Sequence, residues 1–149
     1  MIKLSKFYKN KKVLITGVTG FKGAWLACWL NKMGTNILGI ANNHNKNKDL
    51  FYKLKLKNKN KLIFFDIKNF DKINKSVKKF QPSIIFHLAA QPLIYQSYVE
   101  PYKTFDVNFR GTLNLLETSR INHFVRSLVI VTSDKCYESN NSTKGFKEN

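Results

Sequence analysis

Three glycines near the start of the chain have the spacing of a phosphate-binding turn. An apolar run leads to Gly17, Gly20 and Gly23, and apolar residues at helical spacing follow. Gly17 would permit a tight turn, Gly20 would let backbone N–H groups approach a pyrophosphate, and Gly23 would let a helix pack closely on a strand. The pattern predicts a strand, a glycine turn and a helix that bind a dinucleotide. The alternative is a glycine turn without a ligand, because short glycine motifs also occur by chance.

A second group of reactive side chains ends the apolar run that begins at Ser127. Ser133, Asp134 and Lys135 place a hydroxyl, a carboxylate and an ammonium group in succession. A hydroxyl can orient a substrate, a carboxylic acid can protonate a leaving group and an amine can exchange protons, so the three form a plausible acid–base set. The alternative is a turn at a strand end with a local ion pair.

The elements that would position these groups alternate along the chain. Apolar runs predict strands, helical periodicity predicts helices between them, and no internal repeat is visible. The alternation predicts an α/β fold, a doubly wound, Rossmann-like parallel sheet in the order 3-2-1-4-5. The expected strands are 11–16, 35–41, 61–67, 83–88 and 127–133, and the expected helices are 21–33, 69–80 and 100–122, with a possible short helix at 49–54.

In such a sheet ligands bind at the carboxyl ends of the strands, near the switch between strands one and four. Asp66 at the end of strand three could accept the amine of adenine, or it could cap the next helix. Lys22 could bind a pyrophosphate or be an ordinary surface lysine. Strand two ends in residues 41–44, which hold neither a carboxylate nor an arginine, so the choice between NAD and NADP stays open.

Two further expectations concern the core. His87 lies in an apolar strand, which predicts a buried, hydrogen-bonded histidine and not a catalytic one. Cys28, inside the first predicted helix, is expected to be a small core residue. The long helix is expected to bury four apolar side chains: Phe105, Leu113, Leu116 and Ile121.

The composition predicts one cytoplasmic domain. The 149 residues are 43% hydrophobic, and no run approaches the about 18 apolar residues of a membrane span. The first residues are too polar for a secretory signal, and two distant cysteines, Cys28 and Cys136, suggest reduced thiols. No metal site is predicted.

The net charge of +17 suggests a nucleic-acid partner, but the residue types argue against one. Almost all of the excess is lysine, interleaved with asparagine in 42–48 and 57–61, which is typical of an AT-rich coding sequence. Proteins that read bases use arginine and exposed aromatic side chains. We therefore expect only weak, salt-sensitive binding of nucleic acid and no specific partner of that kind.

Four segments in order resemble those of CDP-glucose 4,6-dehydratases, which are extended short-chain dehydrogenases/reductases. They are 16–26, 86–94 with Ser97 and Tyr98, 108–112 and 131–137, within a resemblance that runs from about residue 11 to about residue 137. The last segment is the most specific, because other sugar-nucleotide dehydratases have Thr-Asp-Glu in place of Ser-Asp-Lys.

The resemblance implies a reaction of CDP-glucose in which a bound nicotinamide cofactor takes hydride from C4, water leaves across C5–C6, and hydride returns to C6. By resemblance Ser133 would orient the 4-hydroxyl, Asp134 would protonate the departing 6-hydroxyl and Lys135 would assist proton removal at C5. The cofactor would be NAD, with NADP not excluded. The implied cofactor contacts are Gly17, Gly20, Phe21, Lys22, Gly23, Asp66, Ile67, Leu88, Ala89 and Ala90.

One departure limits what the resemblance implies. The family needs a Tyr-x-x-x-Lys pair after strand five, and the only match here, Tyr8 to Lys12, precedes strand one. We therefore expect 1–149 to be an incomplete dinucleotide-binding domain without its substrate domain, able to bind NAD weakly but not to turn over. Uncovered apolar faces predict self-association, and the full-length form is expected to be a homo-oligomer. A related epimerase or dehydratase and a non-catalytic NAD(P)-binding module remain alternatives.

Overall fold

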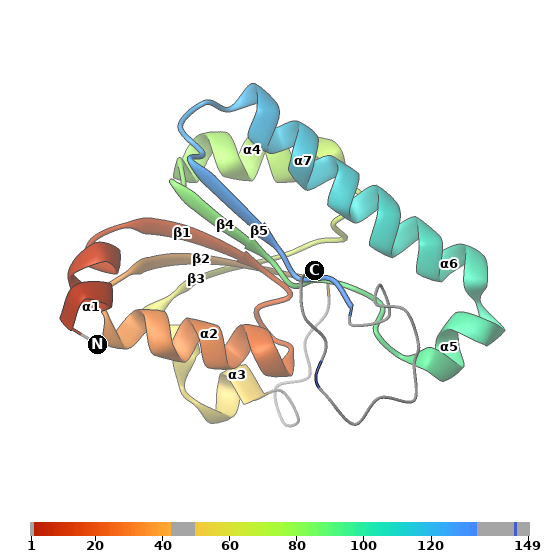
Figure 1. Cartoon of the computed structure of the whole chain (residues 1–149), viewed down its shortest axis with the longest axis horizontal. Coiled ribbons are helices and arrows are strands. Elements are labelled where there is room, and N and C mark those ends of the chain that lie inside the picture. Colours follow the sequence, from red (N-terminus) through yellow and green to blue (C-terminus); the bar gives the residue numbers. More distant parts are fainter. Residues whose placement is uncertain (1, 43–49, 134–144, 146–149) are drawn as a thin grey trace.

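Five parallel strands form one sheet in the order β3-β2-β1-β4-β5 (Figure 1). The computed structural model describes residues 2–42, 50–133 and 145. The doubly wound parallel sheet and its strand order confirm the prediction from the sequence. The strands are β1 (Lys12–Thr16), β2 (Asn36–Ala41), β3 (Lys61–Phe64), β4 (Ile84–His87) and β5 (Ser127–Ile130).

Helices cover both faces of the sheet and bury its alternating side chains (Figure 1). On β1, Val13 and Ile15 belong to the core beneath α2, whereas Leu14 belongs to the core beneath α4 and α7. This alternation follows from the period of two along a strand. The first layer holds α2 (Phe21–Lys32), α3 (Leu50–Lys53) and the 3-10 turn η1 (Leu56–Lys59), and the second holds α4 (Phe70–Phe80) and α7 (Gly111–Ile121).

Two predicted helix ends are confirmed by local geometry. After α2 the chain turns at Gly34, whose φ of +74° suits a residue without a Cβ. Asn69 caps the start of α4, because its side chain accepts a hydrogen bond from the backbone N–H of Lys72 at 3.0 Å. The helix is followed by Gln81, which has a left-handed backbone conformation and directly precedes Pro82.

The predicted long helix at 100–122 is confirmed, since the chain is helical from Pro101 to Ile121, but a change of helix type inside it was not predicted. The helix consists of α6 (Pro101–Phe105), a π-helical turn η2 (Asp106–Arg110) and α7. The sequence also missed α1 (Ile2–Tyr8) and α5 (Ile94–Val99), and it extended strands three and five beyond their observed ends.

Most of the side chains that this helix was predicted to bury are exposed. Phe105, Leu113 and Leu116 are 74%, 49% and 47% exposed, whereas Leu115 is fully buried. The buried stripe contains Gly111, Leu115, Thr118 and Asn122, of which only one is a large apolar residue. A prediction from hydrophobicity alone therefore chose the exposed face of the helix as the buried one. Ile121 is partly buried, and so is Cys28, which packs against the core without belonging to it.

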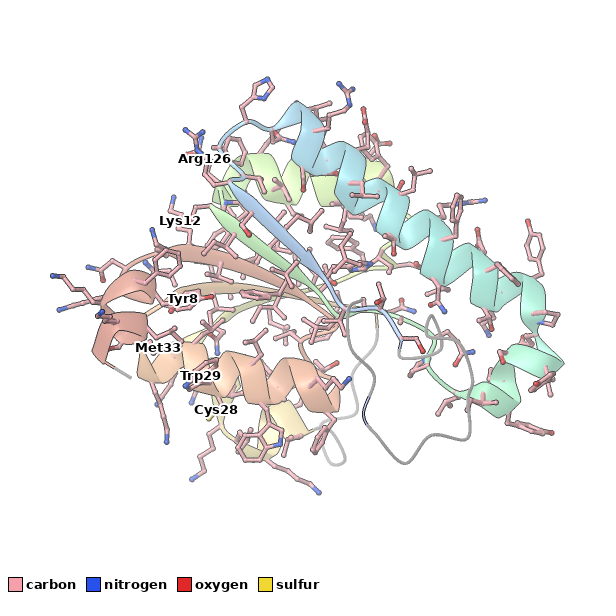
Figure 2. The ribbon with its side chains drawn as sticks, in the orientation of Figure 1. Tyr8, Lys12, Cys28, Trp29, Met33 and Arg126 are labelled. Carbon is pink, nitrogen blue, oxygen red and sulfur yellow. The ribbon has the colours of Figure 1, made fainter. Side chains whose placement is uncertain are left out.

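Tyr8 and Lys12 lie at the amino end of the sheet, as expected from their position before β1. Figure 2 shows both on the same side of the molecule as Arg126, which immediately precedes β5. The carboxyl ends of the strands are at the other edge, so this pair is remote from the region where ligands bind such sheets. None of the helices in the described ranges is long and apolar enough to cross a membrane.

We predict that the chain self-associates through the outer face of α5, α6, η2 and α7. Its exposed side chains are Tyr98, Tyr102, Phe105, Phe109, Leu113 and Leu116, a set that water solvates poorly. Light scattering over a concentration series should give a mass above that of a monomer. Replacing Phe105 and Phe109 by Gln should lower that mass.

The control removes two half-exposed aromatic side chains from α2, by Trp25→Gln and Trp29→Gln. The control should leave the mass unchanged. A monomer at every concentration of the unaltered chain would contradict the prediction.

Candidate functional site

The glycine turn joins β1 to α2 with almost no space for side chains. Gly17 has φ +69°, and a Cβ there would lie 2.8 Å from the backbone nitrogen of Ala89. A Cβ on Gly23 would overlap the carbonyl oxygen of Gly17 and lie 2.8 Å from Cα of Val18. Gly17 and Gly23 therefore have the structural roles predicted for them. Gly20, with φ −68°, is less constrained, and its contact with a pyrophosphate stays a prediction.

A cavity of about 560 Å³ opens beside this turn, at the carboxyl ends of the five strands. Every residue predicted to contact the cofactor lines it, although they come from three separate segments. Those residues are Gly17, Gly20, Phe21, Lys22, Gly23, Asp66, Ile67, Leu88, Ala89 and Ala90. Thr19, Val107, Val131 and Thr132 also line it, although they were not among the predicted cofactor contacts.

A second hollow, of about 520 Å³, continues from the first. Ala89, Ala90, Pro92, Val131 and Thr132 line both. Ser133 lies at the second hollow, together with His87, Gln91 and Asn108. Asp134 and Lys135, the other two predicted catalytic residues, lie outside the described residues, as does Cys136. Among the described residues, no group of three His, Cys, Asp or Glu side chains could hold a metal ion.

The hydroxyl group of Thr16 connects β1 to β4 beneath both hollows. The side chain is fully buried. Its Oγ1 accepts hydrogen bonds from the backbone N–H groups of Leu88 and Ala89, each at 3.2 Å, and lies 2.6 Å from Nδ1 of His87. A hydroxyl has one proton and two lone pairs. Because both lone pairs are used, Thr16 donates its proton to His87.

This assignment fixes the state of the His87 ring. Its Nδ1 is an acceptor, so the proton is on Nε2, which donates to Oγ1 of Thr112 at 3.2 Å. The Thr112 hydroxyl in turn donates to the carbonyl oxygen of Asn108 at 2.7 Å. Burial lowers the pKa of His87 to about 4, so the ring is neutral near pH 7. The expectation of a buried, hydrogen-bonded histidine is confirmed.

Asn108, in the π-helical turn, holds the loop that follows β4. Its Oδ1 accepts from the backbone N–H of Gln91 at 2.8 Å, and its Nδ2 donates to the carbonyl of Gln91 at 3.2 Å. The Gln91 side chain donates to Thr104 and to the carbonyl of Leu93. These contacts fix the backbone wall between the two hollows.

Asp66 lines the first hollow and does not cap α4, because Asn69 has that role. Its Oδ1 accepts from the backbone N–H of Lys68 at 2.9 Å, and its Oδ2 lies 3.7 Å from the Lys68 ammonium. Lys68 also pairs with Asp106 at 2.8 Å, and this hydrogen bond raises the pKa of Lys68 and lowers that of Asp106. The contact of Asp66 with adenine stays a prediction.

Sequence reasoning missed Thr16, Gln91 and Asn108 as residues that build the site. A signal existed for Thr16, which is the polar end of an otherwise apolar run, and such a group needs a partner when buried. A signal also existed for Asn108, because asparagine is a weak helix former and its side chain, inside a predicted helix, is expected to hydrogen-bond to another group. Its partner, Gln91, is a tertiary contact that no spacing reveals.

The sheet order and the two hollows define a doubly wound α/β fold with its cavities at the carboxyl edge of the sheet, where proteins of this fold class bind their ligands. The family model described as GDP-mannose 4,6 dehydratase matches residues 14–149. A CDP-glucose 4,6-dehydratase of Salmonella typhimurium is 40% identical over 143 residues, which are 96% of this chain and 40% of that enzyme. The chain therefore belongs to the GDP-mannose 4,6-dehydratase family, and the resemblance identified from the sequence is confirmed.

Solved structures of similar proteins have the same fold. The epimerase Mth375 of Methanothermobacter thermautotrophicus is similar with a TM-score of 0.84 and 28% identity, over 98% of this chain and 42% of that one. The UDP-glucose 4-epimerase of Thermus thermophilus, solved in complex with NAD, is similar with a TM-score of 0.65 and 26% identity, over 76% and 35%. The chain thus spans less than half the length of these relatives.

We predict that Thr16→Val destabilises the fold by about 2–4 kcal/mol, because it leaves buried polar groups of His87 and Ala89 without their partner. Thr16→Ser keeps the hydroxyl and should cost only about 1 kcal/mol for the lost methyl group. Urea unfolding of the two variants measures the difference. Equal stability of the two would show that the hydroxyl contributes nothing.

The lowered pKa of His87 predicts a pH dependence. The unfolded state, with a pKa near 6.5, binds more protons than the folded state, whose pKa is about 4. Stability should therefore be complete above pH 6.5 and decline by about 3 kcal/mol as the pH falls to 4. Urea unfolding at several pH values measures how the free energy of unfolding changes with pH. His87→Asn should make this slope smaller.

His123 provides the matched control, because it is exposed. His123→Asn should keep the slope of the unaltered chain. The same slope in His87→Asn would refute the assignment to His87.

Proposed function

We propose that this chain is the cofactor-binding part of a sugar-nucleotide 4,6-dehydratase that converts CDP-glucose to CDP-4-keto-6-deoxyglucose with NAD. The observation that carries the proposal is the glycine turn opening on a cavity lined by all ten residues that the sequence indicated for the cofactor. The 40% identity to a CDP-glucose 4,6-dehydratase supports this substrate.

The site suits the pyrophosphate of a dinucleotide. A residue with a Cβ could not replace Gly17 or Gly23, and the space beside them is bounded by backbone. The first turn of α2 leaves the N–H groups of Phe21, Lys22 and Gly23 without partners inside the helix. Together with the helix dipole and the Lys22 ammonium, these groups favour an anion.

The adjoining hollow would receive the hexose. When bound, NAD would supply a hydride acceptor beside it. In this proposal Ser133 orients the 4-hydroxyl, Asp134 protonates the departing 6-hydroxyl and Lys135 assists removal of the proton from C5. Ser133 lines the hollow, and the other two follow it directly in the sequence.

We further propose that the 149-residue chain alone does not complete the reaction. Deprotonation of the 4-hydroxyl needs a base, which the resemblance assigns to the tyrosine of a Tyr-x-x-x-Lys pair. The only such pair, Tyr8 and Lys12, lies at the amino end of the sheet (Figure 2). The chain spans 40% of the Salmonella enzyme, so the activity, the substrate and the homo-oligomeric state of the whole protein are proposals.

A nucleotide-sugar epimerase is the second candidate, favoured by the TM-score of 0.84 to the epimerase Mth375. Residues 133–135 and the pair Gln91-Pro92 favour the dehydratase, because they resemble those of CDP-glucose 4,6-dehydratases and we expect other nucleotide-sugar epimerases and dehydratases to differ there.

We predict that NAD binds to the chain and that Gly20→Val weakens binding by at least about tenfold. The φ of Gly20 suits any residue, but an added Cβ would lie 3.2 Å from the carbonyl oxygen of Gly17, so we expect valine to lower the stability somewhat while its side chain blocks the approach to the turn. Calorimetric titration measures binding, and urea unfolding of the same variant confirms that it is folded.

The absence of heat on titrating the unaltered chain with NAD would contradict the proposal. Equal affinity of the folded Gly20→Val variant would show that the dinucleotide binds elsewhere.

A further inference from the structure

The amino edge of the sheet lies opposite the two hollows and carries a concentration of positive charge. Backbone hydrogen bonds bring the starts of three strands together there, because the carbonyl of Lys12 accepts from Ser83 at 3.0 Å and that of Ser83 accepts from Arg126 at 2.8 Å. Helix α1 lies at the same edge (Figure 1), and α4 ends there, since the Lys12 ammonium is 5.9 Å from the centroid of the Phe80 ring. The exposed basic side chains that we call the basic edge are Lys3, Lys6, Lys9, Lys12, Lys78 and Arg126.

The acids among the described residues lie almost entirely elsewhere. Those that follow β3, begin α4 or belong to the chain between β4 and α7 lie toward the carboxyl edge: Asp66, Asp71, Glu100 and Asp106. Glu117 is nearer to the basic edge, but its carboxylate is paired with Arg120 at 2.7 Å. The six side chains of the basic edge form no ion pair with another described residue. A coding bias toward lysine does not explain why acids are missing from this edge.

Helix α1 holds two apolar side chains outward at this edge. Tyr8 packs against the core, and its carbonyl oxygen accepts a hydrogen bond from the Thr35 hydroxyl at 3.2 Å, which fixes the end of the helix. Leu4 and Phe7 are 43% and 54% exposed, and residues three apart lie on one side of a helix. Lysines precede both of them in the sequence. Apolar side chains bordered by lysines suit the surface of an anionic bilayer, where the former enter the headgroup region and the latter meet phosphates.

The side chains of this edge suit a bilayer better than a nucleic acid. Binding of unpaired bases uses open aromatic faces, but the Lys11 ammonium lies over the Phe7 ring, 4.8 Å from its centroid. The Tyr8 ring packs perpendicular to the Phe7 ring, with 5.0 Å between the centroids. Five of the six side chains in the basic edge are lysines, which lack the planar fork with which arginine reads a base. Point charges on flexible stems are sufficient for a lipid surface.

We propose that the amino edge of the sheet docks on a bilayer surface that carries anionic lipids, through the basic edge together with Leu4 and Phe7. In this orientation the two hollows, which lie at the carboxyl edge, face away from the bilayer and stay open to their ligands. The proposal does not depend on which dinucleotide or sugar nucleotide the hollows bind.

Flotation of the whole chain with lipid vesicles tests the proposal, because self-associated protein does not rise with the lipid. The vesicles are phosphatidylcholine with or without about one-third phosphatidylglycerol, at an ionic strength of about 0.15 M. We expect the chain to float with the vesicles that contain phosphatidylglycerol and to stay behind with phosphatidylcholine alone. The inference is overturned if the chain floats with neither kind of vesicle or equally with both.

The contribution of the basic edge is tested by replacing two of its lysines, by Lys3→Gln together with Lys6→Gln. Binding to the anionic vesicles should weaken by about tenfold or more. The matched control, Lys53→Gln together with Lys72→Gln, removes the same charge from exposed positions on α3 and on the first turn of α4. It should weaken binding by less than about threefold. Equal losses in the two variants would mean that the total charge binds the vesicles and that the amino edge has no special role.

The apolar side chains separate a lipid surface from other polyanions. Phe7→Ser and Leu4→Ser should each weaken binding to the anionic vesicles by about threefold or more and leave binding to a DNA duplex unchanged. Trp29→Ser, which removes a half-exposed aromatic side chain from α2, should change neither. Urea unfolding of each variant confirms that it is folded. If the folded Phe7→Ser and Leu4→Ser variants bind vesicles as the unaltered chain does, the edge binds polyanions in general and the inference is wrong.

Discussion

The buried hydroxyl of Thr16 is the contact on which the site depends. It joins β1 to β4, the two strands between which the strand order of the sheet reverses, and it does so at their carboxyl ends. Helices leave these strands toward opposite faces, which opens a crevice between them at the carboxyl edge of the sheet. The Thr16 hydroxyl fixes the base of that crevice, because it donates a hydrogen bond to the ring of His87 and accepts from the backbone N–H groups of Leu88 and Ala89.

The glycine turn and the loop after β4 both follow from this connection. Because the backbone at Ala89 is held against Gly17, the floor of the first hollow is main chain, which offers dipoles to a ligand. From His87 the hydrogen-bonded series continues through Thr112 to Asn108, which in turn holds Gln91. Two cavities with different chemistry therefore share one polar support that runs from β1 to the π-helical turn.

The sequence was most informative where local rules apply. Glycine spacing and the alternation of strands and helices depend on a few neighbouring residues, and they predicted the glycine turn and the sheet order, whereas the family resemblance supplied most of the residues that line the first hollow. Prediction failed where the outcome depended on distant partners. The buried face of α7 carries Thr118 and leads to Asn122, whose amide bonds to Asn74 on α4, and no hydrophobic pattern reveals such a pair. The cofactor and catalytic roles of the lining residues remain predictions.

The π-helical turn at 106–110 makes the number of residues in this region as important as their identity. Deleting one residue there would convert the wide turn to ordinary α-helix, which costs little locally. A π turn holds one more residue than an α turn over about the same rotation, so the helices on either side would keep their faces. The change would fall on Asn108 inside the turn, because a deletion between Asn108 and Thr112 shortens their spacing. These two residues could then no longer face Gln91 and His87 at the same time. Substitutions along this helix are therefore easier to accommodate than a change in its length.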